Sequence, residues 1–346
     1  MAGLRGYIDS VLDRGLPHLA SAQLSDERRM ELCRQHGDFS LAYSTAVQKN
    51  LSHFGDDKGY IAYATKMGHM FALGDPVADK ADRARYVSDF VAAAERPCFV
   101  QIGRQTAETL SRLGYRINQM GVDTHLVLNE HSFAGKKNET VRYSERWLLK
   151  NGYRIVECDG SLARPDQIKA VSEEWRAGRI VRRREMCFLN RPFKAELSAH
   201  MRRFLILDPQ GETIAVLDFD PIFDAGQVTG YTSTFKRKKT GTTPHAEIGL
   251  TKFATDRFRE EGRSLVTLGL SPLAAITTSG FAESAFWRGR FEYAYKSPAI
   301  NKRIFNLQGQ AAFKRRFHGA EEPTYIAFKR RSPLEMLALL RLLKTL

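Results

Sequence analysis

Residues 201–221, MRRFLILDPQGETIAVLDFDP, decide the fold. Two apolar runs, 201–208 and 213–221, flank a Pro-Gln-Gly turn, and this pattern is typical of a β-hairpin. The elements expected after the hairpin are a strand over 228–235, a helix from about His245 to Glu261, the short apolar strand 264–270, a helical region and the strand 324–328. Hairpins combined with crossover helices predict a mixed sheet covered by helices, which is an α+β fold.

The first half of the chain shows the same order about 150 residues earlier, which indicates two copies of one unit. Its expected elements are the hairpin 59–75, a helix over about 79–95, the short apolar strand 97–103, a helix over 105–114 and the strands 115–121 and 123–129. We therefore predict a first unit over 1–155 that begins with two helices, a second unit over 156–332, and an amphipathic C-terminal helix over 333–346. No low-complexity linker separates the units, so we expect them to pack tightly; one undivided sheet would count against this division.

The net charge of +14 is unevenly distributed. Residues 1–130 carry 15 Lys and Arg against 16 Asp and Glu, whereas the remainder carries 38 against 23. A basic excess confined to one part of a chain favours a polyanionic partner, and both RNA and an anionic membrane surface fit. The alternative is a basic protein without such a partner.

Other features bear on compartment and cofactors. The four cysteines form no CxxC pair, none of the nine histidines has metal-ligand spacing, and no apolar run approaches the roughly 18 residues of a membrane-spanning helix. We predict no metal, no cofactor and a cytoplasmic location, with peripheral attachment to the inner face of the plasma membrane as an option.

Seven strings, in order, match a known family. They are FALGDPV (71–77), LGYRINQMG (113–121), FAGKKNETVRYSERWLLKNGY (133–153), SEEW (172–175), FLNRPF (188–193), LGLSPLA (268–274) and FNLQGQAAFKRRF (305–317). Over roughly residues 28–330 the chain resembles the C-terminal domain of bacterial phosphatidylglycerol lysyltransferases and alanyl-phosphatidylglycerol synthases.

The resemblance implies two acetyltransferase-type (GNAT) units packed against each other with a tunnel between them. It also implies transfer of an amino acid from aminoacyl-tRNA to a glycerol hydroxyl of phosphatidylglycerol. Full-length members carry a membrane-spanning flippase region that this sequence lacks, so we expect a free-standing catalytic module. Because the ester is already activated, the chemistry needs positioning, proton transfer and oxyanion stabilisation rather than a covalent intermediate.

Lys314 is the catalytic candidate that the resemblance implies, either as a phosphate contact or as a stabiliser of the oxyanion. Arg315 and Arg316 would contact phosphate, and Asn306 and Gln308 would donate to a carbonyl. The alternatives are a solvated basic helix end for the cations, which also suits the helix dipole, and hydrogen bonds that satisfy a buried strand end for the two amides.

One part of the motif departs from the family pattern. The family has Asp-x-x-Arg on a strand before an acidic residue that opens a helix; here those positions are Ser233, Lys236 and Glu247. The missing Asp would help to bind the α-ammonium group of the aminoacyl moiety, so amino-acid specificity is in doubt. Glu247 remains a catalytic candidate, with a dipole-favoured helix start as the alternative.

Further basic residues are candidate contacts for tRNA or lipid phosphates. They are Lys136, Lys137, Arg142 and Arg146 on an expected helix, Arg237, Lys238 and Lys239 in an expected loop, and Arg191 as a possible substrate contact. Solvated faces and surface ion pairs are the alternatives. The C-terminal helix, which follows Lys329-Arg-Arg331, either anchors at a membrane interface or packs on the domain.

Three functions are therefore weighed. The leading one is an aminoacyl-tRNA-dependent aminoacyltransferase acting on a polar lipid. The second is an acyl-CoA-dependent GNAT-type N-acyltransferase, which the absence of an R/Q-x-x-G-x-G/A loop after a strand disfavours. The third is a non-catalytic relative that binds RNA or membranes, which the departures at Ser233 and Lys236 motivate.

Overall fold

The computed structural model describes residues 7, 11, 19, 24–158, 164–178, 188–329 and 333–345. Most of the first expected helix lies outside these residues. The second is α2 (Asp26–His36), which begins where the Ser25 side chain accepts a hydrogen bond from the Arg28 amide. The short helix α3 (Ala42–Val47) follows it.

The first half contains three antiparallel strands, a helix, a parallel strand, a helix and a final strand. These elements are β1 (Ser52–Asp56), β2 (Gly59–Lys66), β3 (His69–Leu73), α4 (Arg83–Ala93), β4 (Pro97–Ile102), α5 (Arg104–Arg112) and β5 (Arg116–Val127). The sequence does not predict β1, because its residues are mostly polar. The two strands expected over 115–129 are one long strand, β5, bent at Gly121.

The second half repeats this order. Its elements are β7 (Arg202–Leu207), β8 (Thr213–Asp224), β9 (Gln227–Lys238), α8 (His245–Glu260), β10 (Leu265–Pro272), the helices α9 (Ala285–Lys296), α10 (Pro298–Arg303) and α11 (Leu307–Arg315), and β11 (Ala320–Phe328). The hairpin over 201–221 is β7–β8, and β9 runs parallel to β10 as β3 does to β4. The predicted mixed α+β fold is confirmed.

The strands of the described residues form one 11-stranded sheet, in the order β1-β2-β3-β4-β11-β5-β10-β9-β8-β7-β6. A single undivided sheet counts against a division into two units. The order of its strands, however, explains why the sheet is continuous. The last strand of each half crosses over: β11 pairs with β4 of the first half, and β5 pairs with β10 of the second. Because β5 and β11 also pair with each other, the exchange joins two repeats into one sheet. The boundary at residues 155–156 stays a prediction.

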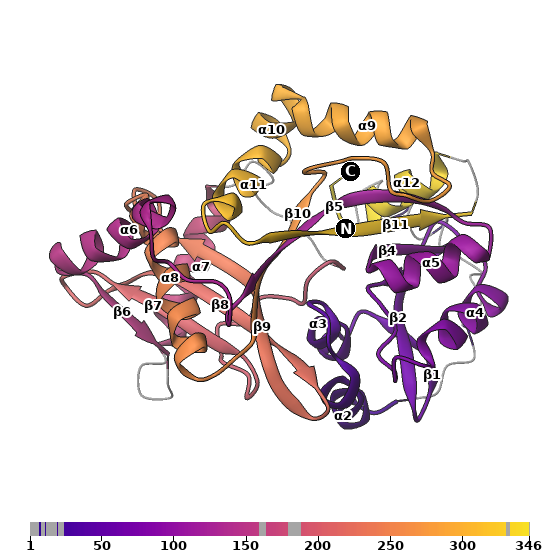
Figure 1. Ribbon diagram of the computed structural model, residues 1–346, viewed down its shortest axis with the longest axis horizontal. Helices are drawn as coiled ribbons and strands as arrows, with labels where there is room; N and C mark the ends of the chain where they lie inside the picture. Colours follow the sequence, from indigo (N-terminus) through magenta and orange to yellow (C-terminus); the bar gives the residue numbers. More distant parts are fainter. Residues whose placement is uncertain are drawn as a thin grey trace.

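The remaining elements connect and cover the sheet. They are the 3₁₀ turn η1 (Lys136–Asn138), α6 (Glu139–Lys150), β6 (Arg154–Glu157) and α7 (Pro165–Ala177). Helices α6 and α8 approach closely at Gly249, where an added Cβ would lie 2.6 Å from Leu148 Cδ1. In Figure 1, α9–α11 run along the top of the molecule, and α2 and α3 lie near its lower edge.

The C-terminal helix α12 (Leu334–Leu342) packs on the first half. Ala338 and Leu339, together with Leu343 just after the helix, are buried in the same core cluster as Tyr60 and Phe71. These three residues therefore pack on the domain and are not available to insert into a membrane.

Candidate functional site

The parallel strands β9 and β10 separate partway along their length. They pair only over Gly230–Thr232 and Leu265–Thr267. Just beyond, the pairing of β10 with β5 shifts between Thr267 and Leu270, which is a β-bulge. Gly269 lies in the bulge with φ 76°, a conformation that favours glycine. The bulge turns the carbonyl groups of Gly269 and Leu270 out of the ladder and toward α11.

The side chain of Lys314, near the end of α11, lies at this bulge of β10. Its Nζ donates hydrogen bonds to the carbonyl oxygens of Gly269 and Leu270, both at 2.7 Å. Burial lowers the pKa of Lys314 from 10.5 to about 7; the Asp123 carboxylate opposes this effect and the Lys236 ammonium adds to it. A substantial share of Lys314 is therefore a neutral amine near pH 7.

The number of hydrogens on Lys314 matters for its chemistry. A neutral amine has two N–H donors and one lone pair, whereas an ammonium has three donors. With two N–H groups directed at the two carbonyls, the lone pair remains available to accept a proton. A proton taken up there becomes the third N–H donor.

Asp123 on β5 lies close enough to Lys314 to affect its pKa. The side chain is 3% exposed, and its Oδ1 is buried with no hydrogen-bond partner among the described residues. Oδ2 lies 3.8 Å from Nε2 of His125. Burial disfavours charge on His125, but Asp123 and Glu322 raise its pKa overall. The site thus contains a buried carboxylate with one unpartnered oxygen beside a lysine whose pKa is lowered to about 7.

Asp123 and His125 are site residues that the sequence analysis misses. Their signal is an Asp-x-His pattern on a strand, which places both side chains on one face. Nothing local shows that this face meets Lys314, because the contact depends on β5 lying beside β10.

Glu247, in the first turn of α8, is linked to the same site by two lysines. Its carboxylate lies 3.4 Å from Lys236 Nζ and 3.1 Å from Lys238 Nζ. Burial opposes ionisation, but the two ammonium groups hold the pKa of Glu247 below its ordinary value. Lys236 Nζ also lies 2.9 Å from the centroid of the Phe313 ring, next to Lys314 in α11. Lys236 and Lys238 lie at the end of β9, so the expected loop there is wrong.

Ser233 also lies close to Gly269 and Lys314. An added Cβ on Gly269 would lie 3.3 Å from the Ser233 carbonyl oxygen and 3.9 Å from Lys314 Nζ. The structure therefore brings Ser233, Lys236 and Glu247 together with Lys314, which lies much later in the sequence.

Other predicted residues of the 305–317 segment have local roles. The Asn306 side chain caps α11 by accepting from the Gly309 amide at 2.9 Å. Gln308 donates from Nε2 to the Tyr295 carbonyl at 3.0 Å. Arg315 pairs with Glu321 at 2.9 Å on the surface, and Arg316 is exposed.

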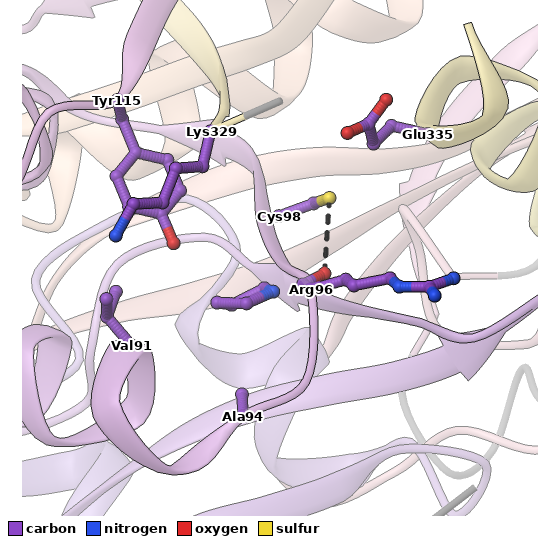
Figure 2. A pocket seen from close by; sticks show the side chains of 8 residues that line it. Val91, Ala94, Arg96, Cys98, Tyr115, Lys329 and Glu335 are labelled. Atoms are coloured by element: carbon purple, nitrogen blue, oxygen red, sulfur yellow. Dashed lines mark hydrogen bonds between the residues drawn. The ribbon is translucent and has the colours of Figure 1, made fainter. Parts of the chain in front are cut away.

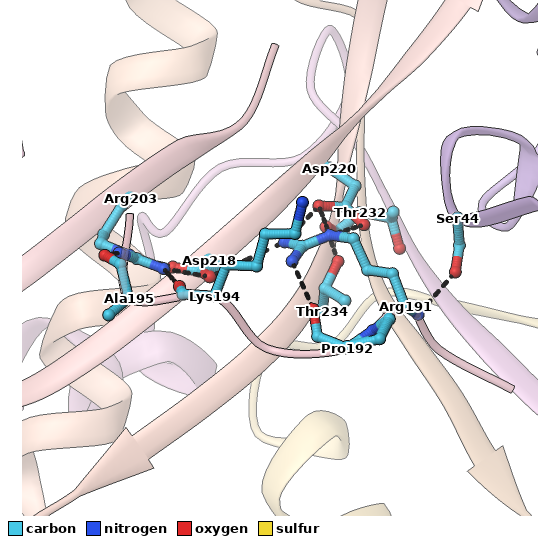
Figure 3. A network of polar contacts seen from close by, with 10 residues as sticks. All are labelled: Ser44, Arg191, Pro192, Lys194, Ala195, Arg203, Asp218, Asp220, Thr232 and Thr234. Atoms are coloured by element: carbon cyan, nitrogen blue, oxygen red, sulfur yellow. Dashed lines mark hydrogen bonds and ion pairs between the residues drawn. The ribbon is translucent and has the colours of Figure 1, made fainter. Parts of the chain in front are cut away.

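Arg191 belongs to a buried network that also involves β8 (Figure 3). It is 4% exposed, and its Nε and Nη2 donate to Asp220 at 2.9 and 2.7 Å. Its main-chain amide donates to Ser44 Oγ at 2.8 Å, which ties this segment to α3 of the first half. Beside it, Arg203 makes a two-bond pair with Asp218 at 2.6 and 2.8 Å. Arg237 is also buried and stacks on Phe193 at 4.0 Å.

Some basic residues of η1 and α6 are exposed to solvent, whereas another is held by hydrogen bonds within the protein. Lys136, Lys137 and Arg146 are exposed. Arg142 donates at 2.6 Å to the carbonyl groups of both Phe133 and Gly135, so it holds the preceding turn. In the second half, Lys239 is partly buried at the end of β9, where its amide donates to the Ile214 carbonyl at 2.9 Å.

In the first half, β3 and β4 correspond to β9 and β10. The space where β3 and β4 separate is filled by a side chain. Asp75 follows β3, and its Oδ1 accepts from the Gly103 amide at 3.0 Å. An added Cβ on Gly103 would lie 2.8 Å from Asp75 Oδ2, so the carboxylate fills the available space. Asp75 thus caps the start of α5, whereas Lys314 lies at the second-half divergence.

Residues 29–328 match the family described as "Phosphatidylglycerol lysyltransferase, C-terminal". The chain belongs to this family. It is 20% identical over 320 residues to a phosphatidylglycerol lysyltransferase of Bacillus subtilis (strain 168), across 90% of this chain but only 36% of that protein. The chain therefore spans about a third of the length of this relative.

Solved structures of related domains share the fold of this family member. The structure of L-PGS from Bacillus licheniformis superposes with a TM-score of 0.76 at 19% identity, covering 94% of this chain and 99% of that one. The C-terminal domain of a putative lysylphosphatidylglycerol synthetase from Agrobacterium fabrum gives 0.75 at 22% identity, covering 91% and 94%.

Two searches of the described residues concern membranes and metals. None of their helices is both long and apolar enough to cross a bilayer. In the same part of the chain, no group of three or more His, Cys, Asp or Glu side chains is placed to hold a metal ion.

Proposed function

We propose that this chain is an aminoacyltransferase that moves an amino acid from aminoacyl-tRNA to a hydroxyl of a polar lipid such as phosphatidylglycerol. Family membership supports the class of reaction. The observation that carries the proposal is the amine of Lys314, fixed by two carbonyl groups where β9 and β10 separate. A titratable amine in a fixed position is what proton transfer between two hydroxyl groups requires.

In the proposed reaction the lipid hydroxyl attacks the ester carbonyl of the aminoacyl group. The neutral amine of Lys314 takes the hydroxyl proton as the new C–O bond forms. The resulting ammonium stabilises the oxyanion and then gives the proton to the ribose oxygen as the old ester bond breaks. Lys314 ends the cycle neutral, and no covalent enzyme intermediate forms.

Asp123 is proposed to bind the α-ammonium group of the donor. The family pattern would place an Asp at position 233, but this chain has Ser there. Asp123 supplies a 3% exposed carboxylate with an unpartnered oxygen at the same site. A cationic α-ammonium group would satisfy that oxygen, so the loss of the Asp at 233 need not abolish donor binding. Glu247, already paired with two lysines, would orient Lys236 rather than meet the donor.

The tRNA is proposed to contact the exposed cations of η1 and α6. Lys136, Lys137 and Arg146 are exposed there. Phosphate contacts of this kind bind by charge and weaken steeply with added salt.

The lipid surface is proposed to meet α9 and α10. Phe286 and Tyr293 on α9 are 59% and 66% exposed, and the Arg290 guanidinium lies 5.1 Å from the Phe286 ring centroid. Their spacing of four and three residues places them on one helical face, and Lys302 and Arg303 of α10 are exposed as well. Exposed aromatic and basic side chains together suit an anionic membrane interface. This face is continuous in the chain with α11, which carries Lys314.

The membrane contact is tested by vesicle co-sedimentation. A Phe286→Ala/Tyr293→Ala double variant is expected to bind phosphatidylglycerol vesicles about tenfold more weakly. Tyr143→Ala, which removes a 48% exposed aromatic from α6, is the matched control and is expected to bind normally. Equal losses in both variants would contradict a docking face on α9.

The reaction is tested by incubating the protein with tRNAs charged with labelled amino acids and with vesicles that contain or lack phosphatidylglycerol. Label is expected in the extracted lipid only when both intact tRNA and the lipid are present. Lys314→Met is expected to reduce the rate about 100-fold or more. No labelled lipid from any charged tRNA would reject the proposal, and binding without transfer would favour a non-catalytic relative.

A further inference from the structure

A cavity lies in the first half of the molecule, away from Lys314. It has a volume of 370 Å³ and is bounded by the end of α4, the start of β4, the end of β11 and α12 (Figure 2). Its lining residues are Val91, Ala94, Arg96, Pro97, Cys98, Tyr115, Lys329 and Glu335. In the β-ladder, Glu322 of β11 is the backbone partner of Asp123 in the candidate active site. Lys329, which lines the cavity, comes seven residues after Glu322. The cavity and the candidate active site are therefore separated by about 20 Å of strand.

Two buried polar groups in this cavity lack partners. Glu335 is 3% exposed, and its Oε2 is buried without a hydrogen-bond donor. Among the described residues it also has no ion pair, in contrast to buried Asp220, which is held by Arg191. Tyr115 is 1% exposed, and its hydroxyl has no partner either.

These groups are costly without a ligand. A buried carboxylate without a donor and a buried hydroxyl without a partner both lose hydration free energy that no hydrogen bond within the described residues returns. Glu335 lies in the first turn of α12, where the helix dipole returns only a small part of that loss. A bound cation that donates hydrogen bonds would satisfy Glu335.

The charges that line the cavity indicate which other groups a ligand would carry besides the cation. Apolar side chains of Val91, Ala94 and Pro97 form part of the wall, while Arg96 and Lys329 are exposed cations at the rim. Figure 2 shows Tyr115 and Lys329 on one side of the cavity and Glu335 on the other. A cationic group is therefore favoured inside, and an anionic group is favoured near the entrance. The volume suits a molecule of a few to about a dozen heavy atoms.

We propose that this cavity binds a small zwitterion, with its ammonium group paired to Glu335 and its anionic group paired to Lys329 on the opposite side. A free α-amino acid and a phosphoethanolamine headgroup share this chemistry. The site is separate from the proposed transfer reaction and shares no residue with it.

The test is isothermal titration calorimetry of the full chain. One arm uses glycine, L-alanine and L-lysine, and the other uses phosphoethanolamine and glycerophosphoethanolamine. Binding in the first arm alone identifies an amino-acid site, and binding in the second alone identifies a headgroup site; either supports the proposal. Glu335→Gln is expected to weaken the affinity about 10- to 100-fold, because it removes a charged hydrogen bond at nearly constant shape. Lys329→Met, at an exposed position, is expected to weaken it several-fold without affecting folding.

Glu130→Gln, which neutralises an exposed carboxylate elsewhere, is the matched control and is expected to leave the affinity unchanged. Two results would overturn the proposal: no heat of binding from either arm, or equal affinity in wild type, Glu335→Gln and Lys329→Met. Because the lining residues do not touch Lys314, lipid aminoacylation by the Glu335→Gln variant distinguishes this failure from failure of the proposed function.

Discussion

The titration of Lys314 gives the most detailed prediction. A pKa of about 7 in place of 10.5 means that the folded protein disfavours the ammonium form by about 5 kcal/mol relative to water. If Lys314 accepts the hydroxyl proton, the rate of transfer should rise with pH through about 7 and then level off. Lys236→Met removes a positive charge that lowers the Lys314 pKa, so the inflection should move to higher pH.

Two measurements check this prediction. The first is the initial rate of lipid aminoacylation from pH 5.5 to 8.5, corrected for spontaneous ester hydrolysis in enzyme-free controls. The second is an NMR titration of ¹³C-methylated lysines, in which Lys314→Met identifies the resonance without reference to activity. A Lys314 resonance that titrates near 10.5, or an inflection that Lys236→Met leaves in place, would refute the reasoning.

Three further predictions concern affinity, stability and packing. Asp123→Asn removes the anion that raises the Lys314 pKa, so the rate inflection should fall to lower pH while KM for the aminoacyl donor rises about tenfold. Between about pH 7 and 10.5 the unfolded chain binds the Lys314 proton and the folded chain does not, so urea unfolding should show wild-type stability rising with pH in this window relative to Lys314→Met. Gly249→Ala places a Cβ 2.6 Å from Leu148 Cδ1, which should cost about 1–3 kcal/mol of unfolding free energy in the same assay; an unchanged midpoint would contradict the close packing of α6 on α8.

The sequence predicts those parts of the fold that depend on local pattern. The hairpin over 201–221 has two apolar runs and a turn signal, so β7 and β8 follow from it. The polar strand β1 has no such apolar run and is missed. The exchange of β5 and β11 is also beyond local pattern, because a strand's own residues do not specify a partner 200 residues away.

The residues of the candidate site also fall into two groups: those that the sequence predicts and those that it does not. Lys314 and Glu247 are named through family resemblance, and the structure links them through Lys236. Asp123 cannot be assigned from sequence, since its relation to Lys314 exists only because β5 pairs with β10. Arg191 resembles a surface cation in the sequence, but the structure buries it against Asp220.

Electrospray mass spectrometry of lipids from otherwise identical cells, with and without this protein, tests the central claim most directly. The account predicts a new lipid heavier than phosphatidylglycerol by one amino-acid residue. It also predicts that this species disappears when Lys314→Met replaces the wild type. Identical lipid spectra from cells with and without the protein, or a new species that persists in the Lys314→Met cells, would contradict it.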